Sequence, residues 1–169
     1  MNQEHSDYSE PISVDGSPVH QDGRAPVLSF DNEELLYRRY LSVHFVEGQL
    51  LPQTFRFPKQ SFNRSKFSNP EDVLHIGCCD GNPLFPSVES WGVLQCRVSA
   101  IPTPIDSSNG EGFHFFPKHV PKPTCYAHSE LWCRRESSSS GDYDSPPASV
   151  REKFRIKLAR VLSSRIPAK

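Results

Sequence analysis

Residues 149–162 read Ser-Val-Arg-Glu-Lys-Phe-Arg-Ile-Lys-Leu-Ala-Arg-Val-Leu, and this stretch decides the fold. Five of its apolar residues recur at i, i+4, i+8, i+11 and i+12, which places them along one side of an α-helix. They are Val150, Phe154, Leu158, Val161 and Leu162. Pro146 and Pro147 precede the stretch, and the pattern from Ser149 to Glu152 predicts a capping box at the helix start. We expect the apolar side of this helix to pack on a β-sheet.

The middle of the chain predicts the strands of that sheet. Trp91–Ile101 is the best of them, because polar and apolar residues alternate along it until two prolines follow. Alternation and aromatic content also favour strands in the second half of Glu33–Phe45 and in Gln53–Phe57, Gly112–Pro117 and Thr124–Arg134. The sheet is therefore expected to hold four to six short, mostly antiparallel strands.

One short helix is predicted near Asn69–His75. Asn69 or Ser68 can cap its start, Pro70 suits the first helical position, and Glu71 and Asp72 suit the positive end of the helix dipole. Together with the C-terminal helix, these elements predict an α+β fold.

Composition divides the chain into four parts. Residues 1–31 hold few large apolar side chains and predict a disordered acidic tail. Residues 32–135 form the α+β core, and residues 136–147 a flexible Ser/Asp/Pro-rich linker or insertion. Residues 148–166 form the C-terminal helix, which belongs to the core domain.

The ends of the chain carry opposite charges. The acids of residues 1–34 are Glu4, Asp7, Glu10, Asp15, Asp22, Asp31, Glu33 and Glu34, against Arg24. The bases of residues 148–169 are Arg151, Lys153, Arg155, Lys157, Arg160, Arg165 and Lys169, against Glu152. This asymmetry indicates either a basic binding surface with an acidic tail that competes for it, or two solvated ends of opposite sign.

The sequence predicts a cytoplasmic location. No apolar run approaches the roughly 18–20 residues of a membrane span. The N-terminus has neither the basic start nor the apolar centre of a signal peptide. The five cysteines, an odd number, are read as reduced thiols.

A zinc site is the first candidate for chemistry. Its ligands would be Cys125 and Cys133 with His128, completed by Cys78 and Cys79. The spacing argues against it, because structural zinc sites use C-x₂-C pairs and a strand puts His128 on the face opposite Cys133. The alternative is small thiols of the core, and no cofactor is expected.

A second candidate is a cluster of Arg38, Ser61, Arg64, His128 and Glu130. His128 and Glu130 are two positions apart, so in a strand they point to the same side and can share a proton. The arginines and the serine can hold an anion. Such residues predict a small nucleotide-binding protein or an enzyme acting on NAD or ADP-ribose. The alternative is a histidine hydrogen-bonded at a sheet edge.

Nucleic-acid binding through the C-terminal helix is a third possibility. Its basic residues would face away from the core and contact phosphates. They are Arg151, Lys153, Arg155, Lys157 and Arg160.

Several short motifs, taken in order, are similar to an uncharacterised family of small bacterial proteins. They are Leu36-Tyr-Arg-Arg39, Ser61-Phe-Asn-Arg64, Asn69-Pro-Glu-Asp-Val-Leu74, Gly92-Val-Leu94, Tyr126-Ala-His-Ser-Glu130, Val150-Arg-Glu-Lys153 and Leu158-Ala159. The resemblance covers about Glu33 to Leu162, and it departs from the family pattern at Asn63, where the family keeps an aspartate. It implies one domain and groups Arg38, Ser61, Arg64, His128 and Glu130, but it implies no reaction.

No complete catalytic pattern is present, so the leading prediction is a non-enzymatic protein. We expect a protein-binding adaptor or accessory subunit of a bacterial multi-protein system, which contacts its partner through the sheet face and the proline-rich loops. The nucleotide-binding or NAD/ADP-ribose enzyme is the alternative from another class.

Overall fold

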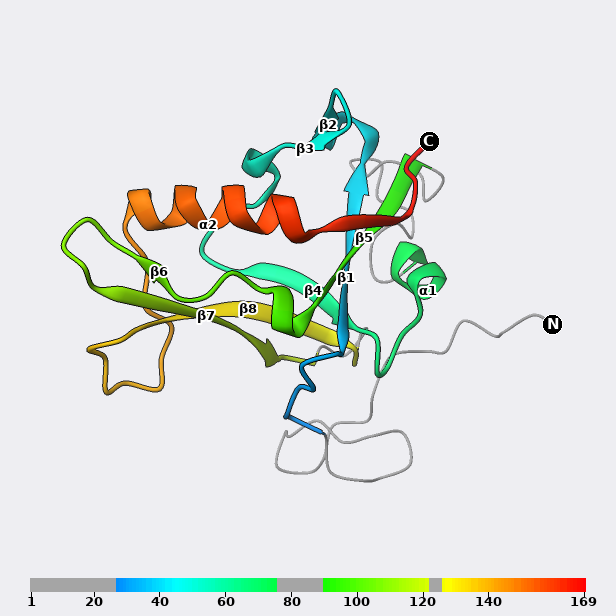
Figure 1. Cartoon of the computed structure of the whole chain (residues 1–169). Helices are drawn as coiled ribbons and strands as arrows, with labels where there is room; N and C mark the ends of the chain where they lie inside the picture. The colour runs from blue at the N-terminus through cyan, green and yellow to red at the C-terminus, as the bar shows by residue number, and fades with distance from the viewer. Residues whose placement is uncertain (1–26, 76–89, 122–125) are drawn as a thin grey trace.

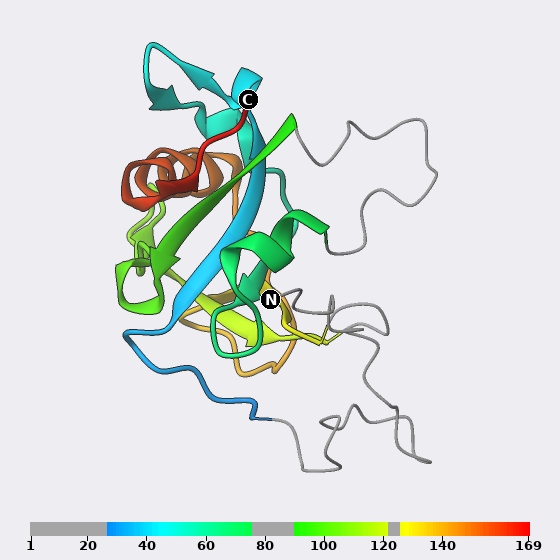
Figure 2. The same ribbon diagram turned by 90° about the vertical axis from the view of Figure 1, so that its right-hand side faces the viewer.

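A computed structural model describes residues 27–75, 90–121 and 126–169, and one large β-sheet runs through them (Figures 1 and 2). The sheet has seven strands in the order β6-β7-β8-β4-β1-β5-β9, and all neighbouring strands are antiparallel. Their bounds are β1 Leu35–Leu41, β4 Gln60–Arg64, β5 Trp91–Arg97, β6 Ile105–Asp106, β7 Gly112–His119, β8 His128–Arg135 and β9 Ser163–Ile166. The predicted α+β class is confirmed, with more strands than expected.

Smaller elements complete the fold. The helices are α1 (Pro70–His75) and α2 (Ala148–Val161), and a separate two-stranded hairpin pairs β2 (Phe45–Val46) with β3 (Gln49–Leu50). The 3-10 turns are η1 (Ser42–His44), η2 (Pro52–Thr54) and η4 (Val98–Ala100). None of the helices in the described ranges is long and apolar enough to cross a membrane.

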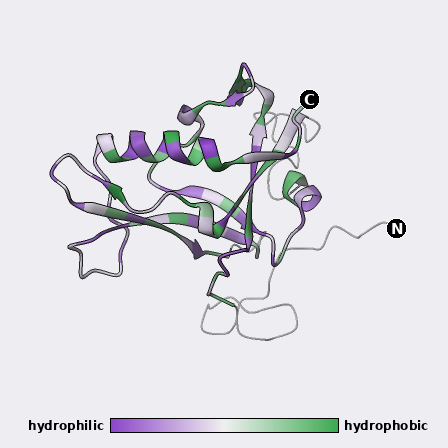
Figure 3. Ribbon diagram, in the orientation of Figure 1, coloured by the Kyte–Doolittle hydropathy of each residue, from purple (hydrophilic) through white to green (hydrophobic). Residues whose placement is uncertain are grey.

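Helix α2 covers one face of the sheet, which we call the inner face. Val150, Phe154 and Leu158 are fully buried there, as the period of the sequence predicts. The Phe154 ring stacks on the Phe115 ring of β7 with 3.8 Å between centroids. Apolar and polar residues alternate along α2 in Figure 3, which matches a helix buried on one side only. Val161 shares the predicted spacing, yet it is the last residue of α2 and remains 36% exposed, so its predicted burial is wrong. The predicted helix 148–166 is also too long, because Ser163–Ile166 pair with β5 as strand β9.

The predicted capping box at Ser149 is wrong. The helix starts at Ala148 and its N-cap is Pro147, which makes no side-chain capping bond, so Ser149 and Glu152 lie inside the first turn. Glu152 instead pairs with Arg155 at 3.6 Å. Pro147 delivers an extended chain directly into the helix, since proline suits helix starts and needs no partner for a backbone N–H.

Helix α1 packs on the opposite, outer face of the sheet. Its Val73 is buried against Tyr37 of β1 and Val93 of β5, which form a second apolar cluster. The backbone N–H of Asp72 donates to Asn69 Oδ1 at 2.8 Å, and the N–H of Asn69 donates to Asp72 Oδ2 at 3.1 Å. The predicted short helix and its asparagine cap are therefore confirmed.

The strand predicted at Gln53–Phe57 is wrong. Pro52 begins the 3-10 turn η2, and the next strand starts only at Gln60. The alternation of polar and apolar residues in Gln53–Phe57 reflects how this turn packs on the core, and not pairing with a neighbouring strand. Phe55 is fully buried, and its carbonyl accepts a hydrogen bond from Arg155 Nε of α2 at 2.7 Å.

Two segments that composition places outside the core make contacts with it. Of the predicted tail 1–31, residues 1–26 lie outside the described part, while the carbonyls of Val27 and Ser29 accept hydrogen bonds from Arg64. Within 136–147, the N–H of Asp144 donates to Cys133 O at 2.9 Å. Tyr143 packs beside the core and its ring meets Trp132 at 6.2 Å between centroids.

Candidate functional site

Ser61, His128 and Glu130 lie together on the outer face of β4 and β8. In the antiparallel register Ser61 is opposite Glu130 and Asn63 is opposite His128. Residues two apart on a strand share a face, so all of these side chains point away from α2. This part of the predicted cluster is gathered by strand pairing.

A hydrogen bond joins the Ser61 hydroxyl to the His128 ring. His128 Nδ1 lies 2.7 Å from Val120 O, and Nε2 lies 3.2 Å from Ser61 Oγ. A carbonyl oxygen only accepts, so Nδ1 carries a proton and, in the neutral ring, Nε2 accepts from the serine hydroxyl. His128 is 6% exposed. The ring is thus held between the Val120 carbonyl and the Ser61 hydroxyl. This arrangement is expected for a histidine that stabilises a sheet, and it also allows the ring to polarise the serine hydroxyl.

The Glu130 carboxylate is engaged away from the ring. Trp132 Nε1 donates to Glu130 Oε2 at 3.2 Å, and Lys59 Nζ lies 3.5 Å from the same oxygen. Glu130 therefore ties β8 to the start of β4 through a lysine.

Arg64 points to the side of the sheet opposite Ser61 and has no exposed surface. Its Nε and Nη2 donate to the two oxygens of Glu34 at 2.7 and 2.8 Å. Nη1 and Nη2 also donate to Val27 O and Ser29 O, both at 2.6 Å. These bonds occupy most of the guanidinium donors, so Arg64 holds the chain before β1 and has little left for an anion.

Arg38 also points to the inner face. Its Nη1 donates to the backbone carbonyl of Ser61 at 2.9 Å, and the guanidinium lies over the rings of Phe55 and Phe62 at 5.5 and 5.6 Å. Burial lowers the pKa of Arg38 to about 10, and the charge of Arg39 acts in the same direction. Arg38 is still a cation at neutral pH.

The five predicted residues thus divide between the faces of the sheet. Ser61, His128 and Glu130 share the outer face, and a hydrogen bond joins the side chains of Ser61 and His128. Arg38 and Arg64 serve the inner side. A binding or catalytic role for them stays a prediction, and an enzyme hypothesis now has to rest on the Ser61–His128 pair.

Two cysteines can be placed. Cys96 and Cys133 are buried on the inner face, and burial raises the pKa of each thiol to about 12. They behave as core residues. Cys78, Cys79 and Cys125 lie outside the described residues. Among the described residues, no group of His, Cys, Asp and Glu side chains has the arrangement of a metal site.

The basic residues of α2 have mixed surroundings. Arg155 binds Phe55 O, and Lys153 Nζ donates to Asp106 O at 2.9 Å. Lys157 and Arg160 are exposed, and Arg151 is half-buried. A nucleic-acid contact through this helix stays a prediction, since part of its charge already holds loops of the fold.

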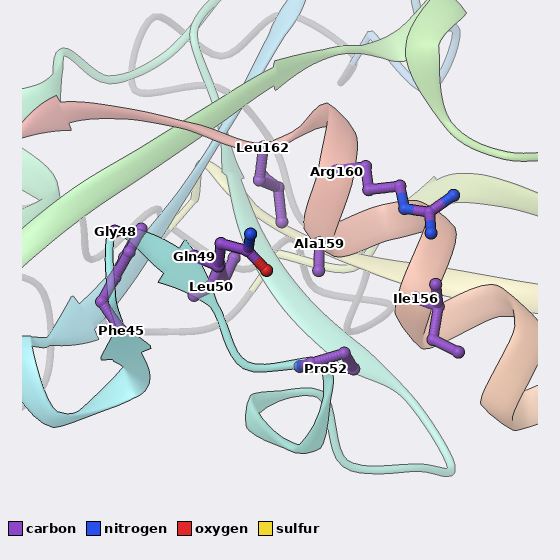
Figure 4. A pocket seen from close by; sticks show the side chains of 9 residues that line it. All are labelled: Phe45, Gly48, Gln49, Leu50, Pro52, Ile156, Ala159, Arg160 and Leu162. Carbon is purple, nitrogen blue, oxygen red and sulfur yellow. The ribbon is translucent and has the colours of Figure 1, made fainter.

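A groove between α2 and the β2–β3 hairpin has a volume of about 510 Å³ (Figure 4). Its lining residues come from two stretches far apart in sequence: Phe45, Gly48, Gln49, Leu50 and Pro52, and Ile156, Ala159, Arg160 and Leu162. Leu50 and Leu162 belong to the main core, so the floor of the groove is an edge of that core.

Sequence reasoning missed this groove. The turn at Glu47-Gly48 is visible, and both residues have positive φ, at 50° and 77°. The flanking strands have only two residues each, too few to show a period. Nothing in the sequence tells that the hairpin stands beside α2.

Comparisons of the chain with protein-family models, with curated protein sequences and with solved structures find no match. The family resemblance of the sequence motifs therefore stays a prediction.

Proposed function

We propose that this chain is a protein-binding adaptor or accessory subunit that holds a peptide segment of its partner in the groove between α2 and the β2–β3 hairpin. The observation that carries the proposal is the groove itself, a concavity of about 510 Å³ with an apolar floor continuous with the core. Concave sites of this size, lined largely by apolar side chains, are typical of ligand and peptide recognition.

Exposed apolar side chains gather on the elements that form the groove. Four large apolar residues are the exposed ones in the described ranges: Leu28 (64%), Val43 (71%), Val46 (53%) and Val161 (36%). Val46 follows Phe45 in β2, Val43 lies two positions before Phe45 in η1, and Val161 follows Arg160 in α2. These three do not line the groove themselves, but they add exposed apolar surface to the segments that flank it.

The charge of the groove selects a partner with acidic residues. Arg160 is the charged residue of the lining, and Lys157 is exposed one turn before it. An amphipathic segment with apolar anchors and a carboxylate can fill the floor and pair with Arg160. Residues 1–26 of this same chain carry Glu4, Asp7, Glu10, Asp15 and Asp22, and they are the natural competitor for this groove.

The test is a selection of peptides from a displayed random library on the full chain. We expect enriched peptides with apolar residues and at least one acid. Their affinity, measured by fluorescence anisotropy, should fall about tenfold in Arg160→Glu, because the change replaces attraction of the peptide carboxylate by repulsion, and tenfold corresponds to about 1.4 kcal/mol. Gln49 is exposed and points into the groove in Figure 4, so Gln49→Trp should block it to a similar extent.

Lys157→Glu is the matched control, since Lys157 is an exposed base on the same helix and does not line the groove. Its effect should stay within about twofold, as for a solvent-exposed charge. Equal losses in Arg160→Glu and Lys157→Glu, or unchanged binding to Gln49→Trp, would contradict the proposal. Tighter peptide binding after deletion of residues 1–26 would support it and identify the competitor.

The proposal also includes a bacterial origin of the partner system and a cytoplasmic location of the chain. The bacterial origin of the partner system rests on the motif resemblance. The cytoplasmic location rests on the sequence.

A further inference from the structure

Aromatic and basic side chains gather on the outer face of β7 and β8, on the side of the sheet opposite α2. We call this surface the aromatic–basic face and define it as Lys59, Phe116, Lys118, Trp132 and Arg134. Phe116 and Trp132 are direct register partners on neighbouring strands. Their chain neighbours Phe115 and Leu131 belong to the inner core, so alternation turns Phe116 and Trp132 outward. Both rings are only half-buried.

The three cations of the aromatic–basic face stand over these rings. Lys118 Nζ lies 3.5 Å and Lys59 Nζ 4.4 Å from the centre of the Trp132 ring, and the Arg134 guanidinium lies 5.6 Å from that of Phe116. All three basic side chains are exposed. Glu130, whose side chain is 17% exposed, is the carboxylate bound to Lys59. Asp144 is a second acid near this face, since its carboxylate interacts with the charge of Arg134. Three cations against two acids leave the face with a small positive charge.

We propose that the aromatic–basic face binds single-stranded RNA. Adjacent strands that present aromatic rings side by side on an open sheet surface can stack two successive bases, and surrounding Lys and Arg side chains can pair with the phosphates. Phe116 and Trp132 supply the rings. Lys59, Lys118 and Arg134 supply the charges.

The present contacts between lysines and Trp132 do not oppose this. A stacked base is worth more than a solvent-exposed cation–π contact, so a base displaces the ammonium group from the ring. The displaced Lys118 is long and exposed and can turn to the phosphate next to that base.

Glu130 and Ser61 favour RNA over DNA. They are register partners beside the aromatic rings, and Ser61 is exposed. A carboxylate or hydroxyl at this place can accept a hydrogen bond from a ribose 2′-hydroxyl, whereas against DNA the Glu130 charge only repels. The surface is separate from the groove, so the inference stands independently of the proposed function.

The experiment measures anisotropy of a fluorescein-labelled oligoadenylate RNA of about 12 nucleotides, a length that suits one small domain. The full chain should bind it more tightly than the DNA of the same sequence or an RNA duplex. With three phosphate contacts, the logarithm of the affinity should fall against the logarithm of salt concentration with a slope of about −2.

Variants of the aromatic–basic face locate the site. Trp132→Ala should weaken RNA binding about tenfold or more, the effect of losing one stacked base. Lys118→Glu and Arg134→Glu change exposed residues, keep the fold, and should each weaken binding about tenfold. Lys157→Glu on α2 makes the same charge change on the other side of the sheet and should have little effect.

Fluorescence reports the stacking directly. The chain has two tryptophans, so Trp91→Phe leaves Trp132 as the sole emitter, and bound RNA should quench it. The inference is overturned if no binding is seen at about 100 µM protein, the weak end of non-specific affinity. It is also overturned if DNA binds equally well, if Lys157→Glu weakens binding as much as Lys118→Glu, or if Trp132 fluorescence stays unchanged on saturation.

Discussion

Arg64 carries its charge with no exposed surface, and its neighbours explain how the fold tolerates it. Glu34 faces it through two hydrogen bonds, and the carbonyls of Val27 and Ser29 complete the shell. The Phe30 ring lies 3.8 Å from the guanidinium. A buried pair of this kind gives little net stability over an apolar pair, but removing one partner leaves an uncompensated charge in the interior. Arg64 thus has a structural role, since it links β4 to residues 27–34.

This gives the first prediction. Glu34→Ala should lower the free energy of unfolding by about 3–5 kcal/mol, because it leaves Arg64 buried and unpaired. The double variant Glu34→Ala with Arg64→Met should cost less than the sum of the two single changes, since the charge leaves with its partner. Urea unfolding of the single and double variants measures both effects.

Glu33 supplies the control for that prediction. It pairs with Arg97 at 3.2 Å, but the two side chains are 74% and 64% exposed. Glu33→Ala should therefore cost no more than about 1 kcal/mol. Similar losses of unfolding free energy in Glu33→Ala and Glu34→Ala would show that the Glu34–Arg64 pair does not behave as a buried ion pair.

Single residues of the candidate site were partly predictable. Ser61 and His128 were grouped from sequence and do touch. Arg64 was grouped with them, yet it is three positions from Ser61 on one strand, and alternation puts such residues on opposite faces. The direction of Arg38 was not predictable, because it depends on the register of β1 against β4.

At the scale of elements, α2 is the helix on which the inner face depends. Phe154 lies between Phe115 at 3.8 Å and Phe57 at 6.0 Å, and no part of it is exposed. Val161 is the last residue of the same helix and is 36% exposed. Substituting each of the two residues by alanine therefore compares a buried with an exposed position of the same helix.

The second prediction compares them. Phe154→Ala should lower the free energy of unfolding by about 3–5 kcal/mol through the lost contacts and the cavity left behind. Val161→Ala should change it by less than about 0.5 kcal/mol, as expected for an exposed position. Thermal and urea unfolding with circular dichroism measures both. A small effect of Phe154→Ala would mean that α2 does not seal the inner face.

Long periodic elements were predictable and short ones were not. The helix α2 and the strand β5 follow from patterns of seven or more residues. Strand β9 has four residues and pairs with β5 with a shift in register between Val93 and Leu94, so its existence depends on tertiary pairing. The hairpin and the turn η2 were missed or misread for the same reason.

At the scale of the whole molecule, the domain begins earlier than composition indicates. Residues 27–31 carry the carbonyls that Arg64 binds, and Phe30 packs on the main core. A reading based on apolar content misses such a boundary, because backbone groups and one ring make these contacts.

The third prediction follows from that boundary. A chain beginning at residue 32 should be less stable than one beginning at residue 27 by about 2–4 kcal/mol, because two hydrogen bonds of the buried Arg64 lose their acceptors. Urea unfolding of the two truncated chains measures the difference. Equal stability would show that the segment 27–31 adds nothing to the domain.

The strand order has a consequence for how this protein folds during its synthesis on the ribosome. Strands β4 and β5 each pair with β1 on one side, but their other partners, β8 and β9, come much later in the chain. One edge of β4 and one edge of β5 therefore stay unpaired while most of the chain has already been synthesised. Pairings this distant in sequence form slowly. We therefore expect the nascent polypeptide to expose unpaired strands until residues 148–166 have left the exit tunnel, and to need chaperone protection up to that moment.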